Sequence, residues 1–158
     1  MARDHFISPQ APEGSYTTVR LGTGSGAANN VTTAEVGKFA RLVGESRYAP
    51  VVIGSDLEAV ITAVEIAPQN GFSIGSISES GKLAVTFDGA EVAGTGAIPI
   101  GAIVNAGAPV AKDTALTVPP AVRQAATPAN VVFKWRVVSL GAAGTGAVGT
   151  QGVIARIA

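Results

Sequence analysis

The chain has 158 residues, of which 47% are hydrophobic, 14% charged and 5% aromatic, and its 11 basic and 11 acidic residues cancel to a net charge of zero. It contains no Cys and a single His, which argues against disulfide stapling, thiolate metal sites and the nucleophile chemistry of many enzymes. The length suits one domain, and neither sign of charge forms a run, so neither nucleic acid nor a membrane surface is an expected partner.

Apolar burial is expected to supply the stability, together with contacts between subunits. The mean hydropathy is +0.38 at zero net charge, whereas isolated soluble monomers usually carry more charge. No apolar stretch approaches the ~20 residues of a transmembrane helix, and the start, MARDHFISPQ, lacks the apolar core of a signal peptide. We therefore expect a protein that is made in the cytosol and remains there until it assembles.

Residues 1–30 are predicted to form an extended N-terminal arm that ends in a Gly-rich loop. Pro9 and Pro12 disfavour helix around themselves and hold the backbone extended. Only the segment from Tyr16 to Leu21 has the character of a strand, and the glycines and asparagines after it indicate a loop.

Three apolar side chains of this arm, Phe6, Ile7 and Tyr16, have no evident local core to enter. They are therefore the candidate contacts with a partner or with a neighbouring subunit. The alternative is that they pack under their own domain, since a terminus is disordered unless something holds it.

Residues 31–158 are predicted to form a single β-rich domain, a small sandwich or a barrel-like, jelly-roll-like fold. Short β-prone runs separated by turn residues at regular spacing favour such an all-β architecture. In residues 31–88 these runs are Gly37 to Val43, Ala49 to Ile53, Ala59 to Ile66, Phe72 to Ile77 and Lys82 to Phe87.

Two segments carry competing helix signals, because Thr32 with Glu35 and Ser55 with Glu58 both fit a capping box. The second signal is followed by apolar residues at helical spacing. We nevertheless predict a strand over residues 59–66, which are rich in β-branched side chains that lose χ1 freedom in a helix.

The Ser80-Gly81 dipeptide lies between two β-prone runs and is a turn signal, so a hairpin is predicted there. Residues 89–130 are rich in Gly, Ala and Pro and are predicted to be an elaborated loop region with one or two strands.

Strand character returns over Val131 to Leu140, followed by a final short strand over Gly152 to Ile157. Alternation along the first of these places Trp135 on the same face as Phe133 and Val137, opposite two cationic side chains. Trp135 is therefore expected in the core beneath a solvated face.

Gly-Thr-Gly recurs at Gly22, Gly94 and Gly144, but the intervals are unequal and the flanking residues differ, so these are interpreted as similar turns and not as a structural repeat. Residues 22–27 also loosely fit the dinucleotide pattern G-x-G-x-x-G/A. A Rossmann site needs a helix that opens at those glycines, whereas here the sequence continues as loop, so no cofactor is expected.

No arrangement of catalytic or metal-binding residues stands out. Asp4 and His5 are the only acid–imidazole neighbours, and a chain terminus is poorly suited to hold a triad. The close acidic pairs, Asp56 with Glu58 and Asp88 with Glu91, lack the spacing of a calcium loop. We expect no catalytic residues, no metal site and no enzyme activity.

Three stretches resemble the head decoration, or capsid cement, proteins of tailed bacteriophages. They are VTTAEVGKFARLVGESRYAP, GFSIGSISESGKLAVTFDG and FKWRVVSLGAAGTGAVGTQGVIARIA. The likeness is one of an aliphatic and Gly-rich pattern, covers well over a third of the chain and includes no catalytic motif.

The resemblance implies a virion protein, made in the host cytoplasm, that binds the outside of the major capsid protein lattice and staples neighbouring capsomers as a homodimer or homotrimer. The alternatives are another virion component, such as a tail-tube, connector or fibre-base protein, or a glycan- or receptor-binding module displayed on the particle.

Overall fold

The computed structural model describes residues 16–22, 31–44, 47–65, 73–79, 81–92, 94–108 and 119–157. These residues form β-strands joined by loops, so the predicted all-β, barrel-like fold is confirmed. The elements are β1 Tyr16–Leu21, η2 Thr33–Glu35, β2 Phe39–Gly44, β3 Arg47–Pro50, β4 Ala59–Glu65, β5 Ser73–Ser78, β6 Lys82–Phe87, β7 Ile103–Ala106, β8 Ala121–Gln124, η3 Pro128–Asn130, β9 Trp135–Ser139 and β10 Gln151–Arg156.

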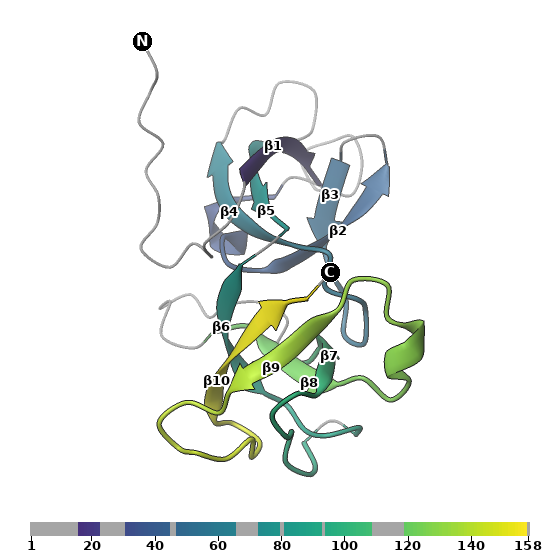
Figure 1. The fold of residues 1–158 in the computed structure, drawn as a ribbon. Helices are drawn as coiled ribbons and strands as arrows, with labels where there is room; N and C mark the ends of the chain where they lie inside the picture. The colour runs from purple at the N-terminus through teal and green to yellow at the C-terminus, as the bar shows by residue number, and fades with distance from the viewer. Residues whose placement is uncertain are drawn as a thin grey trace.

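The strands close into two barrels that lie end to end (Figure 1). The first has the order β1-β3-β2-β4-β5 and the second the order β10-β6-β8-β7-β9. We call the region where they meet the waist; it includes residues 51–58, before β4, and residues 125–134, before β9. Because each sheet closes on itself, these ten strands offer no free edge to a partner strand.

The hairpin predicted about Ser80 and Gly81 is wrong. β5 pairs with β1 and β4, whereas β6 pairs with β8 and β10, so strands that follow one another in the chain belong to different barrels. Ser80 lies outside the described residues, and Gly81 has a φ of 98°. Gly81 therefore lies where the chain crosses from the first barrel to the second. Turn residues allow the chain to change direction, but they do not specify which strands pair.

The strand predicted from Tyr16 to Leu21 is confirmed as β1, and it is part of the first barrel. It pairs antiparallel with β5 from Tyr16 to Leu21 and parallel with β3. The stretch predicted to be an arm, residues 1–30, therefore includes one of the five strands of the first barrel. Residues 1–15 and 23–30 lie outside the described residues.

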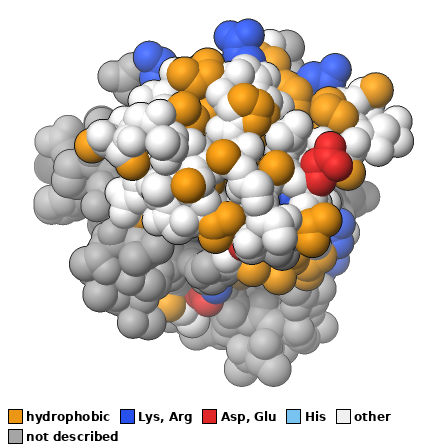
Figure 2. All heavy atoms as spheres, turned by 90° about the horizontal axis from the view of Figure 1, so that it is seen from below, with side chains coloured by type: hydrophobic (Ala, Val, Ile, Leu, Met, Phe, Trp, Pro, Cys, Tyr) orange, Lys and Arg blue, Asp and Glu red, His pale blue; other side chains and the backbone are white. Residues whose placement is uncertain are grey.

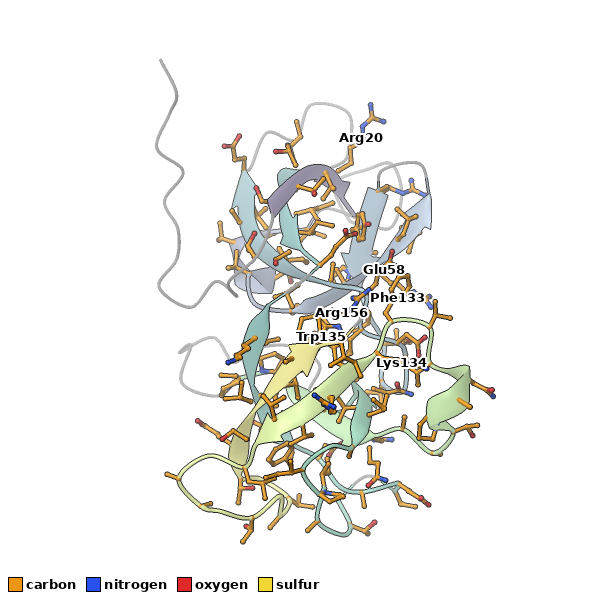
Figure 3. The ribbon with its side chains drawn as sticks, viewed as in Figure 1. Arg20, Glu58, Phe133, Lys134, Trp135 and Arg156 are labelled. Atoms are coloured by element: carbon orange, nitrogen blue, oxygen red, sulfur yellow. The ribbon has the colours of Figure 1, made fainter. Side chains whose placement is uncertain are left out.

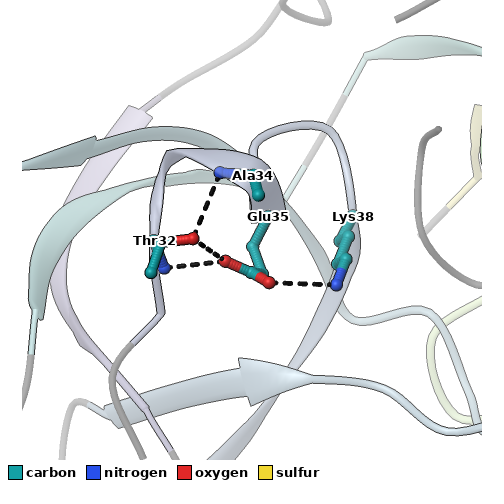
Figure 4. Close-up of polar contacts among 4 residues, drawn as sticks. All are labelled: Thr32, Ala34, Glu35 and Lys38. Carbon is teal, nitrogen blue, oxygen red and sulfur yellow. Dashed lines mark hydrogen bonds and ion pairs between the residues drawn. The ribbon is translucent and has the colours of Figure 1, made fainter. Parts of the chain in front are cut away.

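The capping box at Thr32 and Glu35 is confirmed, on the short helix η2 (Figure 4). The Thr32 amide donates to Glu35 Oε2 at 2.7 Å, and Ala34 N donates to Thr32 Oγ1 at 3.3 Å. Lys38 Nζ lies 3.2 Å from Glu35 Oε1. Burial raises the pKa of Glu35, but the bonds from Thr32 and Lys38 outweigh it and lower that pKa overall.

The second helix signal, at Ser55 and Glu58, starts no helix. Strand β4 begins directly after it, as the β-branched residues of this segment predict. The Glu58 side chain instead accepts a hydrogen bond from Leu42 N at 2.8 Å, which ties the start of β4 to β2.

The two barrels repeat one topology. β1 and β3 pair in parallel in the first barrel, as β6 and β8 do in the second, and every antiparallel pair also has its counterpart. Strands β1 to β5 thus correspond in chain order to β6 to β10. The registers agree as well: Leu21 lies opposite Tyr48 at the end of the first parallel pair, and Phe87 lies opposite Val122 in the second.

The irregularities of the sheets repeat too. β4 has an extra residue within Ile61–Ala63 against β5, and β9 has one within Val137–Ser139 against β10. Beside each bulge the partner strand carries a glycine, Gly75 or Gly152. A Cβ on either would overlap with the carbonyl oxygen of the last bulge residue and with a side chain of the barrel's first strand.

A turn before the second strand of each barrel is also shared. Gly37 N donates to Ile61 O at 2.7 Å, and Gly101 N donates to Val137 O at 2.8 Å. The two glycines have φ values of 89° and 88°. The Gly-Thr-Gly tripeptides do not occupy corresponding positions, so the repeat is carried by other residues.

Trp135 joins the barrels at the waist. Its side chain is fully buried, as the alternation predicts, and its Nε1 donates to the Leu57 carbonyl oxygen at 2.7 Å. Leu57 is also fully buried. The core of the second barrel therefore continues without a break to the first-barrel side chains Phe39, Val51, Leu57 and Val60.

Corresponding segments meet at this junction. Asp56 and Val132 each lie three residues before the start of corresponding strands, and Val132 N donates to Asp56 Oδ2 at 2.9 Å. Where a two-fold axis relates two copies of a fold, corresponding residues come into contact close to that axis. Figure 1 agrees, because β4 and β9 run away from the waist in opposite directions.

The charges at the waist differ between the halves. Glu58 corresponds to Lys134 and Glu79 to Arg156, so acidic positions in the first barrel are basic in the second. Arg156 Nη1 donates to Glu58 O at 2.6 Å, and its guanidinium lies 4.9 Å from the Phe133 ring centroid (Figure 3). Burial lowers the pKa of Arg156, whereas Glu79 and Glu58 favour its charged form.

We expect Gly75→Ala and Gly152→Ala each to lower the free energy of unfolding by about 1–3 kcal/mol or more, because a Cβ must displace backbone at the bulge. Urea unfolding measures the change. Gly44→Ala is the control, since its Cβ would meet only the Arg47 guanidinium, at 3.2 Å from Nη2, which is free to shift. Equal tolerance of all three variants would contradict the shared bulge geometry.

We expect Trp135→Ala to lower the free energy of unfolding by about 3–5 kcal/mol, through the cavity it leaves at the waist. Trp135→Phe should have a smaller effect, because it restores part of the volume but leaves the Leu57 carbonyl without its donor. Val132→Ala, at a position 71% exposed, is the control and should change stability by less than about 0.5 kcal/mol. A melting temperature unchanged by Trp135→Ala would contradict the role of the indole.

Candidate interaction surface

Three of the four acidic residues singled out in the sequence make structural contacts. Asp56 and Glu58 accept backbone hydrogen bonds at the waist. Asp88 pairs with Arg123, while Glu91 is exposed in the same loop. Within the part of the chain that the structure describes, no three His, Cys, Asp or Glu side chains gather as metal ligands would.

The candidate interaction surface is formed by two loops at the far end of the second barrel. They are the β6–β7 loop, residues 88–102, and the β9–β10 loop, residues 141–150. Apart from Asp88, which is engaged in an ion pair, the two loops contain only one charged residue, Glu91. Figure 2 views this end of the molecule: hydrophobic and uncharged surface occupies its centre, and Lys and Arg side chains lie at its edge.

The two loops are held against each other. Ile98, 1% exposed, is part of the second barrel's core, and its amide donates to Gly146 O at 2.9 Å. A Cβ on Gly146 would overlap with the Ile98 carbonyl, so only glycine allows this approach. Thr150 Oγ1 bonds within its own loop, to Ala147 O at 2.7 Å.

Asp88 anchors the other end of the β6–β7 loop. Its Oδ2 accepts from Arg123 Nη2 at 2.7 Å and from Ala108 N at 2.9 Å, and its carbonyl accepts from Gly94 N at 2.6 Å. Thr95 Oγ1 bonds to Val92 O at 2.8 Å within the loop. Loops with this density of internal bonds have little conformational entropy left to lose when a partner binds.

The large hydrophobic side chains that these loops expose are Val92, Ile100 and Val148, with exposed fractions of 65%, 63% and 44%. The end of the molecule seen in Figure 2 is mainly hydrophobic and uncharged with Lys and Arg at its edge, which is the usual anatomy of a protein-binding surface. We call residues 89–92, 94–102 and 141–150 the end face. Its low charge is visible in the sequence, but the meeting of its two loops is not.

The predicted arm contacts have a different status. Phe6 and Ile7 lie outside the described residues, and of Tyr16 only the backbone, in β1, is described. They remain predictions. Trp135, the best candidate for stacking on a sugar, is buried and hydrogen-bonded, so it presents no ring to a ligand.

No family model, no curated protein and no solved structure matches the chain. Among the described residues no helix is long and apolar enough to cross a bilayer.

Removal of residues 1–15 is expected to leave both barrels folded, because β1 begins at Tyr16. Removal of residues 1–20 deletes most of β1 and should open the first barrel. Melting temperature separates the two variants, and light scattering reports whether the shorter deletion dissociates the expected homodimer or homotrimer. An unchanged oligomer after removal of 1–15 would take Phe6 and Ile7 out of the subunit contact.

Proposed function

We propose that this protein is a non-enzymatic structural protein of a phage virion, which binds the outer surface of the assembled capsid and cements neighbouring capsomers. The observation that carries the proposal is the end face: a preorganised, almost uncharged surface on a scaffold whose ten described strands offer no free edge. Its partner is the major capsid protein. The protein is made in the host cytoplasm and resides on the capsid exterior.

A cement protein acts by mass action. It binds the assembled lattice and not the dispersed subunit, so each bound copy stabilises the shell by the free energy of its contacts. Rigid loops suit this role, because little ordering entropy opposes binding. Small and aliphatic side chains allow close approach over a wide area, in which many modest contacts replace a few polar anchors.

The low charge of the end face carries a physical consequence. Binding driven by apolar burial and shape is expected to change little with ionic strength, since screening acts on charges. Attraction between oppositely charged surfaces would instead weaken as salt is added. The response to salt therefore separates use of the end face from use of any charged surface of the molecule.

Other roles on a particle remain distinct alternatives. A tail-tube, connector or fibre-base protein would be present at far lower copy number than a cement protein. A glycan- or receptor-binding module needs an accessible aromatic platform, and the burial of Trp135 removes the strongest candidate for one.

We expect the double variant Val92→Glu/Val148→Glu to fold normally and to lose particle binding, because two carboxylates must be desolvated in an apolar interface. Co-sedimentation with capsids of the source phage measures binding, and melting temperature reports folding. The matched control is Val52→Glu/Val132→Glu, at waist positions of 63% and 71% exposure.

The control variant should pellet with shells as the wild type does, at a stoichiometry that follows the lattice. Equal binding by all three proteins would remove the end face from the mechanism. Failure of the wild-type chain to bind any capsid would overturn the proposed function itself.

A further inference from the structure

The outward face of strands β6, β10 and β9 in the second barrel carries cations without acids. Lys82 of β6 and Arg136 of β9 are both register partners of Ala155, which lies on β10 between them. Register partners share a face of a sheet. Both cationic side chains are exposed, whereas the neighbours that alternate with them, Leu83 and Trp135, are buried in the core. Lys82 and Arg136 therefore point outward on the two sides of β10.

The surface between these two cations is small and uncharged. Figure 1 shows the three strands side by side, and because neighbouring strands lie about 4.8 Å apart, the backbones that carry Lys82 and Arg136 are about 10 Å apart. Lys134, two residues before Arg136, extends the same side of β9. We call Lys82, Lys134, Arg136 and Ala155 the cationic face. The other outward residues of β6 and β10 are Ala84, Thr86, Gln151 and Val153.

No acid neutralises the cationic face within the described part of the chain. Strands β6, β9 and β10 contain no acidic residue, and the ion pairs among the described residues involve other cations. Glu79, in the crossing before β6, accepts a hydrogen bond from the Tyr48 hydroxyl at 2.7 Å. Glu58, at the waist, accepts one from Leu42 N at 2.8 Å. The carboxylates near the waist are thus engaged with the first barrel.

We propose that the cationic face binds an acidic peptide segment of a protein partner. Charge complementarity identifies the occupant, because hydrogen bonds between cationic side chains and carboxylates are the strong ones. Arg136 offers a guanidinium fork that matches a carboxylate in a bidentate geometry, and Lys82 and Lys134 add point charges. The small side chain of Ala155 between them allows a peptide backbone to approach the sheet closely.

A nucleic acid is the weaker match for this face. Its bases would need exposed aromatic rings to stack on, whereas the outward residues of these three strands are aliphatic, polar or cationic. Its phosphates are usually bound by larger sets of cations, and the chain has no net positive charge. The inference does not rest on the proposed function, because the cationic face shares no residue with the end face and its test needs no capsid.

Fluorescence anisotropy of labelled hexaglutamate with the purified full-length chain tests the proposal. The wild type is expected to bind at low ionic strength and to release the peptide as salt is added, because salt screens exposed charges. Lys82→Gln/Arg136→Gln should weaken binding about tenfold, since both cations beside β10 are lost. The melting temperature of each variant reports whether it is folded.

Ala155→Glu tests the same face without removing a cation. The new carboxylate would lie between Lys82 and Arg136 on the neighbouring strands, where opposite charges interact across a sheet. It would occupy the cations that the peptide needs, so binding should again weaken about tenfold. Ala155→Gln adds a side chain of the same shape without the charge, and it should bind hexaglutamate within about twofold of the wild type.

The control for general attraction by charge is Arg20→Gln/Arg41→Gln, at exposed positions of the first barrel. This variant loses two positive charges, whereas Ala155→Glu gains only one negative charge. Attraction by net charge alone would therefore make the control the weaker binder of the two. The proposal instead expects the control to bind hexaglutamate within about twofold of the wild type.

A wild type that does not bind hexaglutamate would overturn the proposal, as would a greater loss in Arg20→Gln/Arg41→Gln than in Ala155→Glu. Tighter binding of an oligothymidylate than of hexaglutamate, lost in Ala155→Glu, would overturn it in favour of a nucleic-acid partner.

Discussion

The buried bond between the Trp135 indole and the Leu57 carbonyl is the contact on which the architecture depends. Each barrel has few strands, and the first retains only a small core of its own. Both partners of this bond are fully buried, so an unmade bond would leave polar atoms without water or protein partner. Together with the core that the barrels share around it, this bond holds the two barrels against each other, and the surfaces at their far ends are placed by that junction.

The duplication separates what the two barrels share from what differs between them. Five strands, a bulge and a Gly turn recur, so the backbone requirements of both barrels are the same. What differs is the outer side chains: the waist carries acids on one half and cations on the other, as Glu58 and Lys134 illustrate. Two identical halves would bring like charges together there, whereas the unlike halves attract.

Local features could be predicted from the sequence, whereas strand pairing could not. The β-branched residues of β4 predict a strand, and the alternation around Trp135 predicts its burial; both predictions are confirmed. Each depends only on the residue types within one short segment. The hairpin at Gly81 failed because pairing is non-local. The duplication is not predictable from the sequence, because few identities mark it, such as Gly75 with Gly152, and the offset between corresponding segments varies with loop length. The low charge of the end face was visible in the sequence, but its geometry depends on contacts such as Ile98 with Gly146.

The packed waist also determines how the end face can act. This surface lies at the extremity of the second barrel, so it cannot turn independently of the first barrel while the shared core and the Trp135 bond hold the two together. Apolar burial at the end face is non-directional and short-ranged. The orientation of the bound chain must therefore come from the shape of the two loops, which the contact between Ile98 and Gly146 holds together.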